Sequence, residues 1–311
     1  MSWSTRDIPD QTGRVAVITG ANGGLGLASA KALAGKGAHV VMAARNQAKA
    51  AAARDEILAL HPGASLEIVE LDLASRASVE AAAATISGAH ERIHLLMNNA
   101  GLMAMPQATT VDGFETQWGV NVLGHCVLTS LLLPTIVATP GARVVWLSSV
   151  AQHQATGLKE DPQMREGYKS WHVYSQTKLA NRLMAMGLQR RFEQAGVSAM
   201  SLVAHPGGTD SDLQSHTATA GGGGLQGKFY ERMVPMVGMS TDRGALSQLR
   251  AATDPHADPH KQYCPLFSFT GPPVAKPMVR PGTDGDIERL WAMNERDTGL
   301  TLDPKAAQSA S

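Results

Sequence analysis

The chain has 311 residues, of which 43% are hydrophobic, so it can bury a substantial core and intrinsic disorder is excluded as its main state. Its 27 lysines and arginines balance 27 aspartates and glutamates, which excludes the strongly basic surface of a nucleic-acid-binding protein. The two cysteines, Cys126 and Cys264, form no C-x-x-C metal or redox motif. These properties favour small-molecule chemistry and predict a cytoplasmic location.

No membrane segment is predicted. Arg6, Asp7 and Asp10 precede the first apolar run, so the first residues lack the hydrophobic core of a signal peptide. Residues 120–137 are largely apolar, but polar side chains and Pro134 interrupt them, which makes the stretch too polar for a membrane-spanning helix. We therefore expect a soluble protein without an integral membrane segment.

Short apolar runs alternate with longer helical patterns along most of the chain. Strands that are apolar on both faces are typical of a parallel sheet that helices cover on both sides. The sequence therefore predicts an α/β fold, a doubly wound Rossmann type with a seven-stranded parallel sheet. Six of these strands are indicated by the runs 14–18, 38–43, 65–70, 93–97, 143–147 and 197–203, and helical patterns lie near 25–36, 47–60, 77–87, 111–133 and 173–194.

We expect one Rossmann-type domain over residues 1–302 and a flexible tail over residues 303–311. Residues 13–211 form the predicted cofactor-binding and catalytic core, and residues 212–302 form a C-terminal substrate-binding extension. Within this extension, four consecutive glycines at 221–224 are either a surface linker or the hinge of a flap over a ligand.

A glycine-rich turn follows the first predicted strand. Glycine permits the backbone angles of a direct strand-to-helix turn, and bare backbone at a helix N-terminus can bind the pyrophosphate of a dinucleotide. The glycines are spaced Gly-x-x-x-Gly-x-Gly rather than Gly-x-Gly-x-x-Gly as in other dinucleotide folds. The cofactor-binding residues predicted in this turn are Gly20, Asn22, Gly23, Gly24, Leu25 and Gly26.

The end of the second predicted strand indicates which nicotinamide cofactor is bound. A carboxylate at this place accepts hydrogen bonds from the ribose of NAD and repels the 2′-phosphate of NADP, but this chain has Arg45 there. A guanidinium can bind that phosphate through paired hydrogen bonds. We therefore favour NADP(H) over NAD(H). The alternative is that Arg45 is an ordinary solvated arginine.

Tyr174 and Lys178 are four positions apart, so a helix places them on one face, one turn apart. An ammonium beside a phenol favours the tyrosinate and brings the phenol pKa from about 10 toward the working pH. Such a phenol can exchange a proton with an alcohol. The pair therefore predicts acid–base catalysis, and a surface Tyr and Lys at helical spacing is the alternative.

The glycine spacing together with Tyr174-x-x-x-Lys178 resembles the short-chain dehydrogenases/reductases, and the similarity runs over about residues 13–211. The resemblance implies NAD(P)-dependent interconversion of alcohols and carbonyls. It implies that Ser149 binds the substrate oxygen and that Asn121 orders a water chain leading to the lysine. The adjacent Ser148 is expected to face the sheet or the backbone of the cofactor loop.

Further cofactor contacts are implied by the same resemblance, at the ends of the third, fourth and sixth strands. As alternatives, asparagines also cap strand ends, and a Pro-Gly pair is often only a turn. The residues concerned are Asp72, Leu73, Asn99, Ala100, Gly101, Pro206, Gly207 and Thr209, besides Tyr174 and Lys178 themselves.

Residues 120–125, 148–153 and 178–181 resemble the retinol dehydrogenase and protochlorophyllide reductase-like branch of this family. The N-terminal anchor of animal retinol dehydrogenases is not seen, which disfavours a retinoid. We expect a lipophilic alcohol or carbonyl compound, because residues 213–239 are apolar and no obvious arginine cluster follows Pro206. Methionines at 233, 236 and 239 are either helix core or pocket wall.

Other functions are weighed against this one. A sensor or scaffold that binds NADP(H) without turnover has no chemical need for Tyr174 and Lys178 together, and nothing in the cofactor loop indicates an epimerase or dehydratase. No metal is expected, because His256 and His260 do not share a helix. The assembly is left open between a homodimer and a homotetramer.

Overall fold

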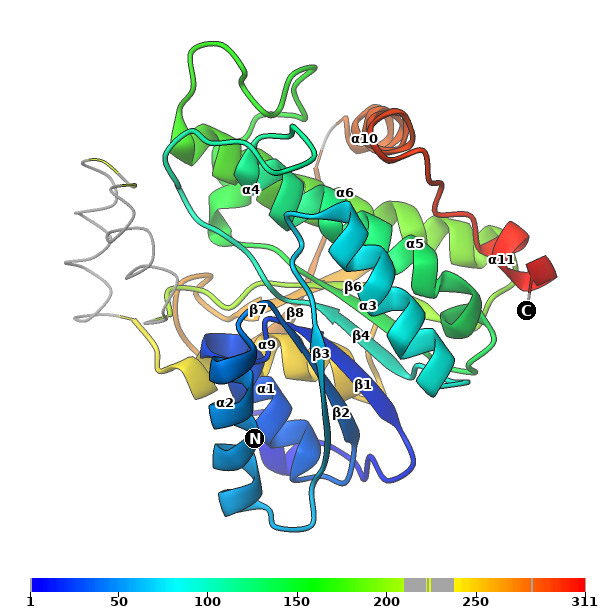
Figure 1. Ribbon diagram of the computed structural model, residues 1–311. Coiled ribbons are helices and arrows are strands. Elements are labelled where there is room, and N and C mark those ends of the chain that lie inside the picture. The colour runs from blue at the N-terminus through cyan, green and yellow to red at the C-terminus, as the bar shows by residue number, and fades with distance from the viewer. Residues whose placement is uncertain (1, 210–221, 223, 225–237, 281, 311) are drawn as a thin grey trace.

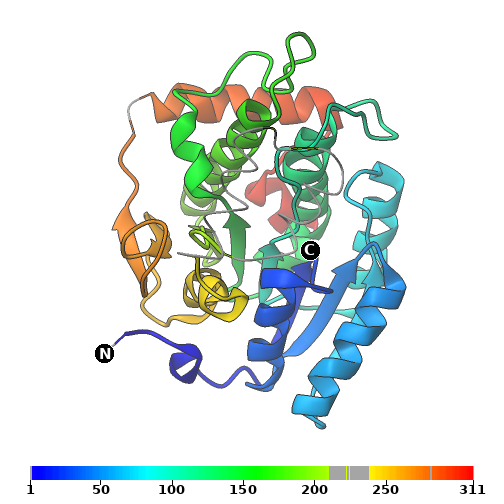
Figure 2. The same cartoon turned by 90° about the vertical axis from the view of Figure 1, so that its left-hand side faces the viewer.

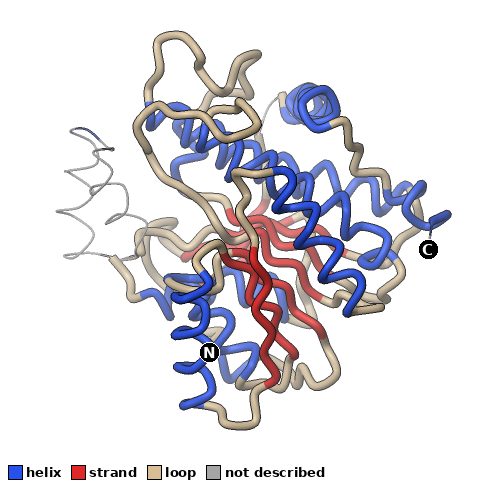
Figure 3. Tube along the Cα trace, in the orientation of Figure 1, coloured by secondary structure: helices blue, strands red, loops and turns tan. Residues whose placement is uncertain are grey.

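The computed structural model describes residues 2–209, 222, 224, 238–280 and 282–310. An eight-stranded sheet forms the middle layer, in the order β3-β2-β1-β4-β5-β6-β7-β8, and helices cover both of its faces (Figures 1 and 3). The strands are β1 Val15–Thr19, β2 His39–Ala44, β3 Ser65–Glu70, β4 Leu95–Asn98, β5 Arg143–Leu147, β6 Met200–Ala204, β7 Lys261–Pro265 and β8 Pro273–Pro277. The predicted doubly wound α/β fold is confirmed.

A separate hydrophobic core lies on each side of the sheet. Figure 2 shows the sheet and its helices turned by 90°. Helices α1, α2 and α9 cover one face, and α3, α5, α6, α10 and α11 cover the other. The long helices are α1 Gly24–Ala34, α2 Gln47–Leu60, α3 Arg76–Ala89, α5 Gly124–Val137, α6 Ser170–Gln194, α9 Thr241–Thr253, α10 Thr283–Thr298 and α11 Pro304–Ala310. Short helical turns are η1 Thr5–Asp7, α4 Thr116–Trp118, η2 Gly119–Leu123 and η3 Val150–Gln154.

The strands from β1 to β7 pair in parallel, so their carboxyl ends meet at one edge of the sheet. After β3 the chain crosses back over the sheet and forms β4 on the other side of β1. The strand order therefore reverses between β1 and β4, and the space between the carboxyl ends of these two strands is the switch point of the sheet. Ligands of doubly wound folds bind at such a point. The predicted site residues follow β1, β4, β5 and β6, and therefore gather at this edge.

The sheet has one strand more than the predicted seven, and this last strand is not parallel. Strand β8 pairs antiparallel with β7, with Lys261 opposite Pro277 and Pro265 opposite Pro273. Prolines at the ends of these segments hid them in the sequence, because proline removes a backbone donor from a strand. At the edge of a sheet that donor is not needed, so the prolines are tolerated.

The prediction of a flexible tail over residues 303–311 is wrong. Residues 304–310 form helix α11, and Leu302 and Ala307 are buried in the core beside α5. The C-terminal segment is thus packed onto the domain.

The helix expected over residues 111–133 begins later and is interrupted. Gly113 has a left-handed backbone (φ +86°), and the Glu115 carboxylate accepts a hydrogen bond from the Trp118 backbone at 2.7 Å, which starts α4. A π-helical turn, η2, then joins α4 to α5. π-Turns inside helices are frequent at functional sites, and this one carries the predicted catalytic asparagine.

Within the described part of the chain, one helical stretch is long and apolar enough to cross a membrane by length and composition. It is Thr116–Val137, with a mean hydropathy of 1.8, and 67% of its apolar window is buried inside the fold. Its apolar side chains pack in the core on the α3 side of the sheet. Location in the cell and membrane association stay predictions.

Candidate active site

The glycine turn between β1 and α1 has no room for side chains. Gly20 and Gly24 have left-handed backbones, with φ of +69° and +50°. A Cβ on Gly26 would lie 2.1 Å from the Gly20 carbonyl oxygen and 2.7 Å from Nδ2 of Asn99. Only glycine fits at this position, and the backbone is left bare at the start of α1, as phosphate binding requires. Asn22, Gly23 and Leu25 are half-buried in the same turn.

Thr19, the last residue of β1, ties this turn to the loop after β4. Its hydroxyl oxygen accepts hydrogen bonds from the backbone of Asn99 (3.0 Å) and Ala100 (2.9 Å). The Asn99 amide in turn donates to the Thr19 carbonyl at 2.8 Å. The structure thus brings together the two predicted cofactor segments, and it uses Asn99 to hold them.

A buried histidine extends this network, and sequence reasoning missed it. His125 Nε2 lies 2.9 Å from the Thr19 hydroxyl, and Nδ1 lies 3.2 Å from the Asn121 carbonyl. The Asn121 carbonyl can only accept, so Nδ1 carries the ring proton, and Nε2 of the neutral ring accepts from the Thr19 hydroxyl, whose proton also lies within reach of the Met97 carbonyl (3.3 Å). Burial lowers the pKa of His125 from 6.5 to about 4, which keeps the ring neutral. The sequence did contain one signal for this residue, namely a histidine inside an otherwise apolar helical stretch.

Asn121 holds three segments together from the π-turn η2. Its amide nitrogen donates to the Leu102 carbonyl (2.9 Å) and to the Thr177 hydroxyl on α6 (3.0 Å). Its amide oxygen accepts from the Leu102 backbone at 2.7 Å. The side chain therefore fixes the loop after Gly101 against the helix that carries Tyr174. Its predicted part in a water chain stays a prediction.

Tyr174 and Lys178 lie one turn apart on α6, as their spacing predicts, and both are only 4% exposed. Lys178 Nζ donates to the Leu147 carbonyl at 3.1 Å and lies 5.7 Å from the centre of the Tyr174 ring. Burial lowers the pKa of Lys178 to about 8. A Cβ on Gly101 would lie 3.4 Å from Nζ, so the loop after β4 reaches the ammonium group.

The two adjacent serines after β5 have different environments. Ser148 is buried, and its hydroxyl donates to the Lys178 carbonyl at 2.7 Å. The expectation that Ser148 faces the sheet or the cofactor loop is therefore wrong: it anchors α6. Ser149 is half-buried and caps η3 by accepting from the Ala151 backbone at 3.2 Å. Of the two, Ser149 is the one with access to a substrate.

Arg45 and Asp72 meet at the ends of β2 and β3. The Arg45 side chain is 73% exposed, and its Nη1 lies 3.9 Å from Asp72 Oδ2. The Asp72 carboxylate also accepts a hydrogen bond from the Ala74 backbone at 3.0 Å. The neighbouring Leu73 packs closely against Gly124, because a Cβ on Gly124 would lie 2.5 Å from the Leu73 carbonyl oxygen. Arg45 is thus lightly held and can turn toward a ligand.

The turn after β6 lies over the start of α1. Gly207 has φ +78°, and the hydroxyl of Thr209 donates to the Pro206 carbonyl at 3.3 Å. A Cβ on Gly244 would meet both Thr209 (2.4 Å) and Leu25 (3.1 Å), so this turn, α9 and the glycine loop are adjacent.

The substrate-loop predictions largely lie outside the described residues. This holds for Met233, Met236, most of the apolar segment 213–239 and part of the glycine run. Met239 is described: it is buried, and its backbone donates to the Gly208 carbonyl at 2.8 Å.

The C-terminal extension also braces the cofactor loop, which the sequence did not reveal. Gln248 of α9 donates to the Ser29 hydroxyl (2.7 Å) and to the Asn99 side-chain oxygen (3.1 Å).

Basic side chains gather near two histidines beyond Ser149 and β6. Burial, together with the charges of His153, Lys276 and Arg182, lowers the pKa of His205 to about 3. Burial, followed by the charges of Arg182 and Arg280, lowers the pKa of His153. Of these basic residues, Lys276 and Arg280 follow Pro206 in the sequence and Arg182 precedes it.

The fold and this arrangement define a Rossmann-type oxidoreductase, and comparison with known proteins identifies the family. The family model for short chain dehydrogenases matches residues 14–220. The chain therefore belongs to the short-chain dehydrogenase/reductase family.

Comparison with individual relatives identifies the branch of the family to which the chain belongs. Human retinol dehydrogenase 12 is 39% identical over 206 residues, which cover 66% of this chain and 65% of that protein. Polyprenol dehydrogenase of Mus musculus is 39% identical over 213 residues, or 67% of this chain and 64% of that protein. The chain thus spans a little under two thirds of the length of these relatives, and it is a member of the retinol dehydrogenase-like branch.

A solved structure shares almost the whole fold. An uncharacterised protein from Mycobacterium paratuberculosis superimposes with a TM-score of 0.75 at 36% identity, over 97% of this chain and 99% of that one.

Proposed function

We propose that this protein is an NADP(H)-dependent oxidoreductase that interconverts an alcohol and a carbonyl on a lipophilic small molecule. Tyr174 is its acid and base, Lys178 favours the tyrosinate, and Ser149 orients the substrate oxygen. Asn121 supports the proton relay.

The observation that carries this proposal is the buried ammonium group beside Tyr174. Lys178 is 4% exposed, and its ammonium group faces the Leu147 carbonyl oxygen and lies over the Tyr174 ring. Burying a charge without a counterion is costly, and burial has already lowered its pKa to about 8. With that pKa the group is still mainly charged at neutral pH, so it can stabilise a tyrosinate. Cofactor binding alone does not require this ammonium to lie beside a phenol, whereas proton transfer does.

The residues present fit a nicotinamide dinucleotide. The turn at Gly20 and Gly26 leaves bare backbone at the N-terminus of α1, where a pyrophosphate binds. Gly101 leaves the Lys178 ammonium accessible from the same side. The bound nicotinamide supplies or accepts the hydride. The chain's own task is to hold the substrate oxygen at Ser149 and to move a proton at the Tyr174 hydroxyl.

Cofactor preference is proposed to depend on Arg45. We expect Arg45→Asp to reverse the preference from NADP(H) to NAD(H), because the change removes an attraction for the 2′-phosphate and adds a carboxylate that repels it. Titration of both cofactors against both proteins measures this. Arg92→Asp is the matched control, because it makes the same charge change at an exposed position before β4. Unchanged NADP affinity in Arg45→Asp would show that Arg45 is only solvated.

The proposed substrate class rests on the relatives and on the apolar segment that follows β6. Two relatives carry names that specify retinol and polyprenol, both of which are apolar alcohols. The basic groups around Lys276 and Arg280 favour a second candidate, an apolar molecule that also bears an acidic group.

Turnover assays on the purified chain separate these substrate classes. We expect loss of NADPH absorbance with apolar aldehydes or ketones, and none in Tyr174→Phe. Matched substrates with and without a terminal carboxylate test the basic cluster. Activity confined to sugar phosphates or small acids would overturn the lipophilic assignment. NADPH binding without turnover on any carbonyl would favour a sensor or scaffold.

A further inference from the structure

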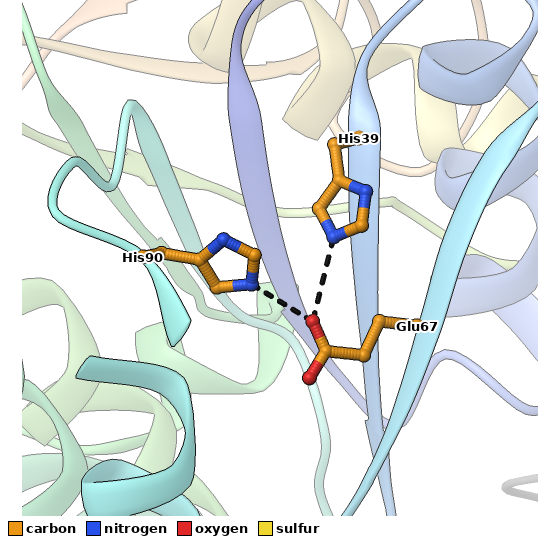
Figure 4. A group of neighbouring side chains, drawn as sticks. All are labelled: His39, Glu67 and His90. Carbon is orange, nitrogen blue, oxygen red and sulfur yellow. Dashed lines mark hydrogen bonds and ion pairs between the residues drawn. The ribbon is translucent and has the colours of Figure 1, made fainter. Parts of the chain in front are cut away.

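At the edge of the sheet opposite the proposed active site, His39, Glu67 and His90 turn their side chains toward one another (Figure 4). His39 begins β2, Glu67 lies in β3, and His90 caps the C-terminus of α3. Glu67 Oε2 lies 2.8 Å from His90 Nε2 and 3.4 Å from His39 Nε2. One ligand atom from each residue lies within 4.8 Å of the other two. Three segments distant in sequence thus converge on one point.

The donor set matches that of a zinc site. Two imidazole nitrogens and one carboxylate oxygen are ligands that Zn²⁺ binds at about 2.0–2.2 Å, with an open fourth position for water. Tetrahedral bonds of that length separate neighbouring ligand atoms by about 3.3 Å. The two measured separations from Glu67, 2.8 and 3.4 Å, lie on either side of this value. Small side-chain rotations are therefore enough to admit an ion.

A second contact orients one of the ligands. His39 Nδ1 lies 2.7 Å from the Ser65 hydroxyl, on the side of the ring away from Glu67. Histidines that bind metal usually donate their other ring N–H to such an acceptor, which directs the free nitrogen to the ion. The side chains of His39, Glu67 and His90 are 27%, 28% and 15% exposed, so the point is shielded yet open to water.

The two imidazole rings lie 5.0 Å apart and share a single carboxylate oxygen. The three ligand atoms therefore face one common point, where a single divalent cation can contact all of them.

We propose that His39, Glu67 and His90 bind one Zn²⁺ ion, with water as the fourth ligand. The ion links the edge strand β3 to β2 and to the end of α3. The site is separate from the proposed catalytic residues, which lie at the carboxyl edge of the sheet. The expectation from sequence that the chain has no metal site considered His256 and His260. Among the described residues, neither belongs to this group, and His260 pairs with Glu193 at 3.1 Å.

Calorimetric titration of the full chain, stripped with EDTA and then given ZnCl₂, tests this site. We expect one Zn²⁺ per chain. His90→Ala and Glu67→Gln should each abolish this binding, while the exposed His256→Ala should retain it. Ser65→Ala leaves all three ligands in place and should weaken affinity by about tenfold to a hundredfold.

Thermal melting provides a second readout that does not depend on activity. Zn²⁺ should raise the Tm of the wild type and of His256→Ala, and should leave the Tm of Glu67→Gln unchanged. If His90→Ala or Glu67→Gln does not fold, Ser65→Ala still tests the site. Absence of stoichiometric binding in the wild type, or equal binding in Glu67→Gln and His90→Ala, would show an ion-pair cluster only.

Discussion

Replacing Tyr174 with Phe is expected to abolish turnover while NADPH binding stays close to that of the wild type. The change removes one hydroxyl and leaves the ring, which packs edge-on against Trp171 at 5.9 Å. Proton transfer by a positioned side chain contributes about 10²- to 10⁴-fold to a rate, so kcat should fall by that amount or more. Steady-state kinetics and a fluorescence titration of NADPH measure the two effects separately.

Tyr263→Phe is the matched control for this experiment. It also removes a phenol hydroxyl, but one that accepts from the Asp258 backbone at 2.7 Å, at the amino end of β7. It should leave kcat unchanged. Lys178→Ala should lower both cofactor binding and kcat, because its ammonium group lies near Gly101 as well as Tyr174. A kcat for Tyr174→Phe within about tenfold of the wild type would remove Tyr174 from its assigned role.

The parts of the site that sequence could predict are those that follow strands. In a parallel sheet all carboxyl ends meet at one edge, so Gly20, Asn99, Ser149 and Pro206 gather there once the strands are recognised. The spacing of Tyr174 and Lys178 is likewise set by one helix. Local patterns were therefore sufficient for these residues.

The residues that sequence missed depend on partners far along the chain. His125 bonds Thr19 across 106 positions, and Gln248 bonds Asn99 across 149. No local period marks such pairs, and the π-turn that carries Asn121 is not visible as a pattern. Helix α11 was missed for a related reason, because its burial rests on the tertiary contacts of Leu302 and Ala307.

These distant contacts place a buried, neutral histidine at the centre of the site. His125 connects the end of β1 to the π-turn, and its ring must stay uncharged to accept the Thr19 proton. Acid is therefore expected to act on the same network that holds the cofactor loop.

Stability should fall as the pH is lowered from about 6.5 toward 4, and His125→Gln should reduce this dependence. In the unfolded chain a histidine binds its proton near pH 6.5, whereas in the folded chain burial lowers the pKa of His125 to about 4. Between these values the unfolded state binds the extra proton, so the free energy of unfolding decreases by about 3 kcal/mol.

The measurement is urea unfolding of the wild type and His125→Gln at several pH values between 7 and 4, in about half-unit steps. The two proteins are compared by the slope of the unfolding free energy against pH. The unfolding free energy itself is not compared, because Gln at this position also lowers stability at neutral pH. His205, whose pKa burial lowers to about 3, contributes in the same direction, so the wild type keeps part of its slope after the first replacement. His256→Asn removes an exposed histidine and serves as the reference. Equal slopes in the wild type and His125→Gln would mean that His125 becomes charged over the same pH range in the folded and the unfolded chain, with the Thr19 hydroxyl then donating to the Met97 carbonyl.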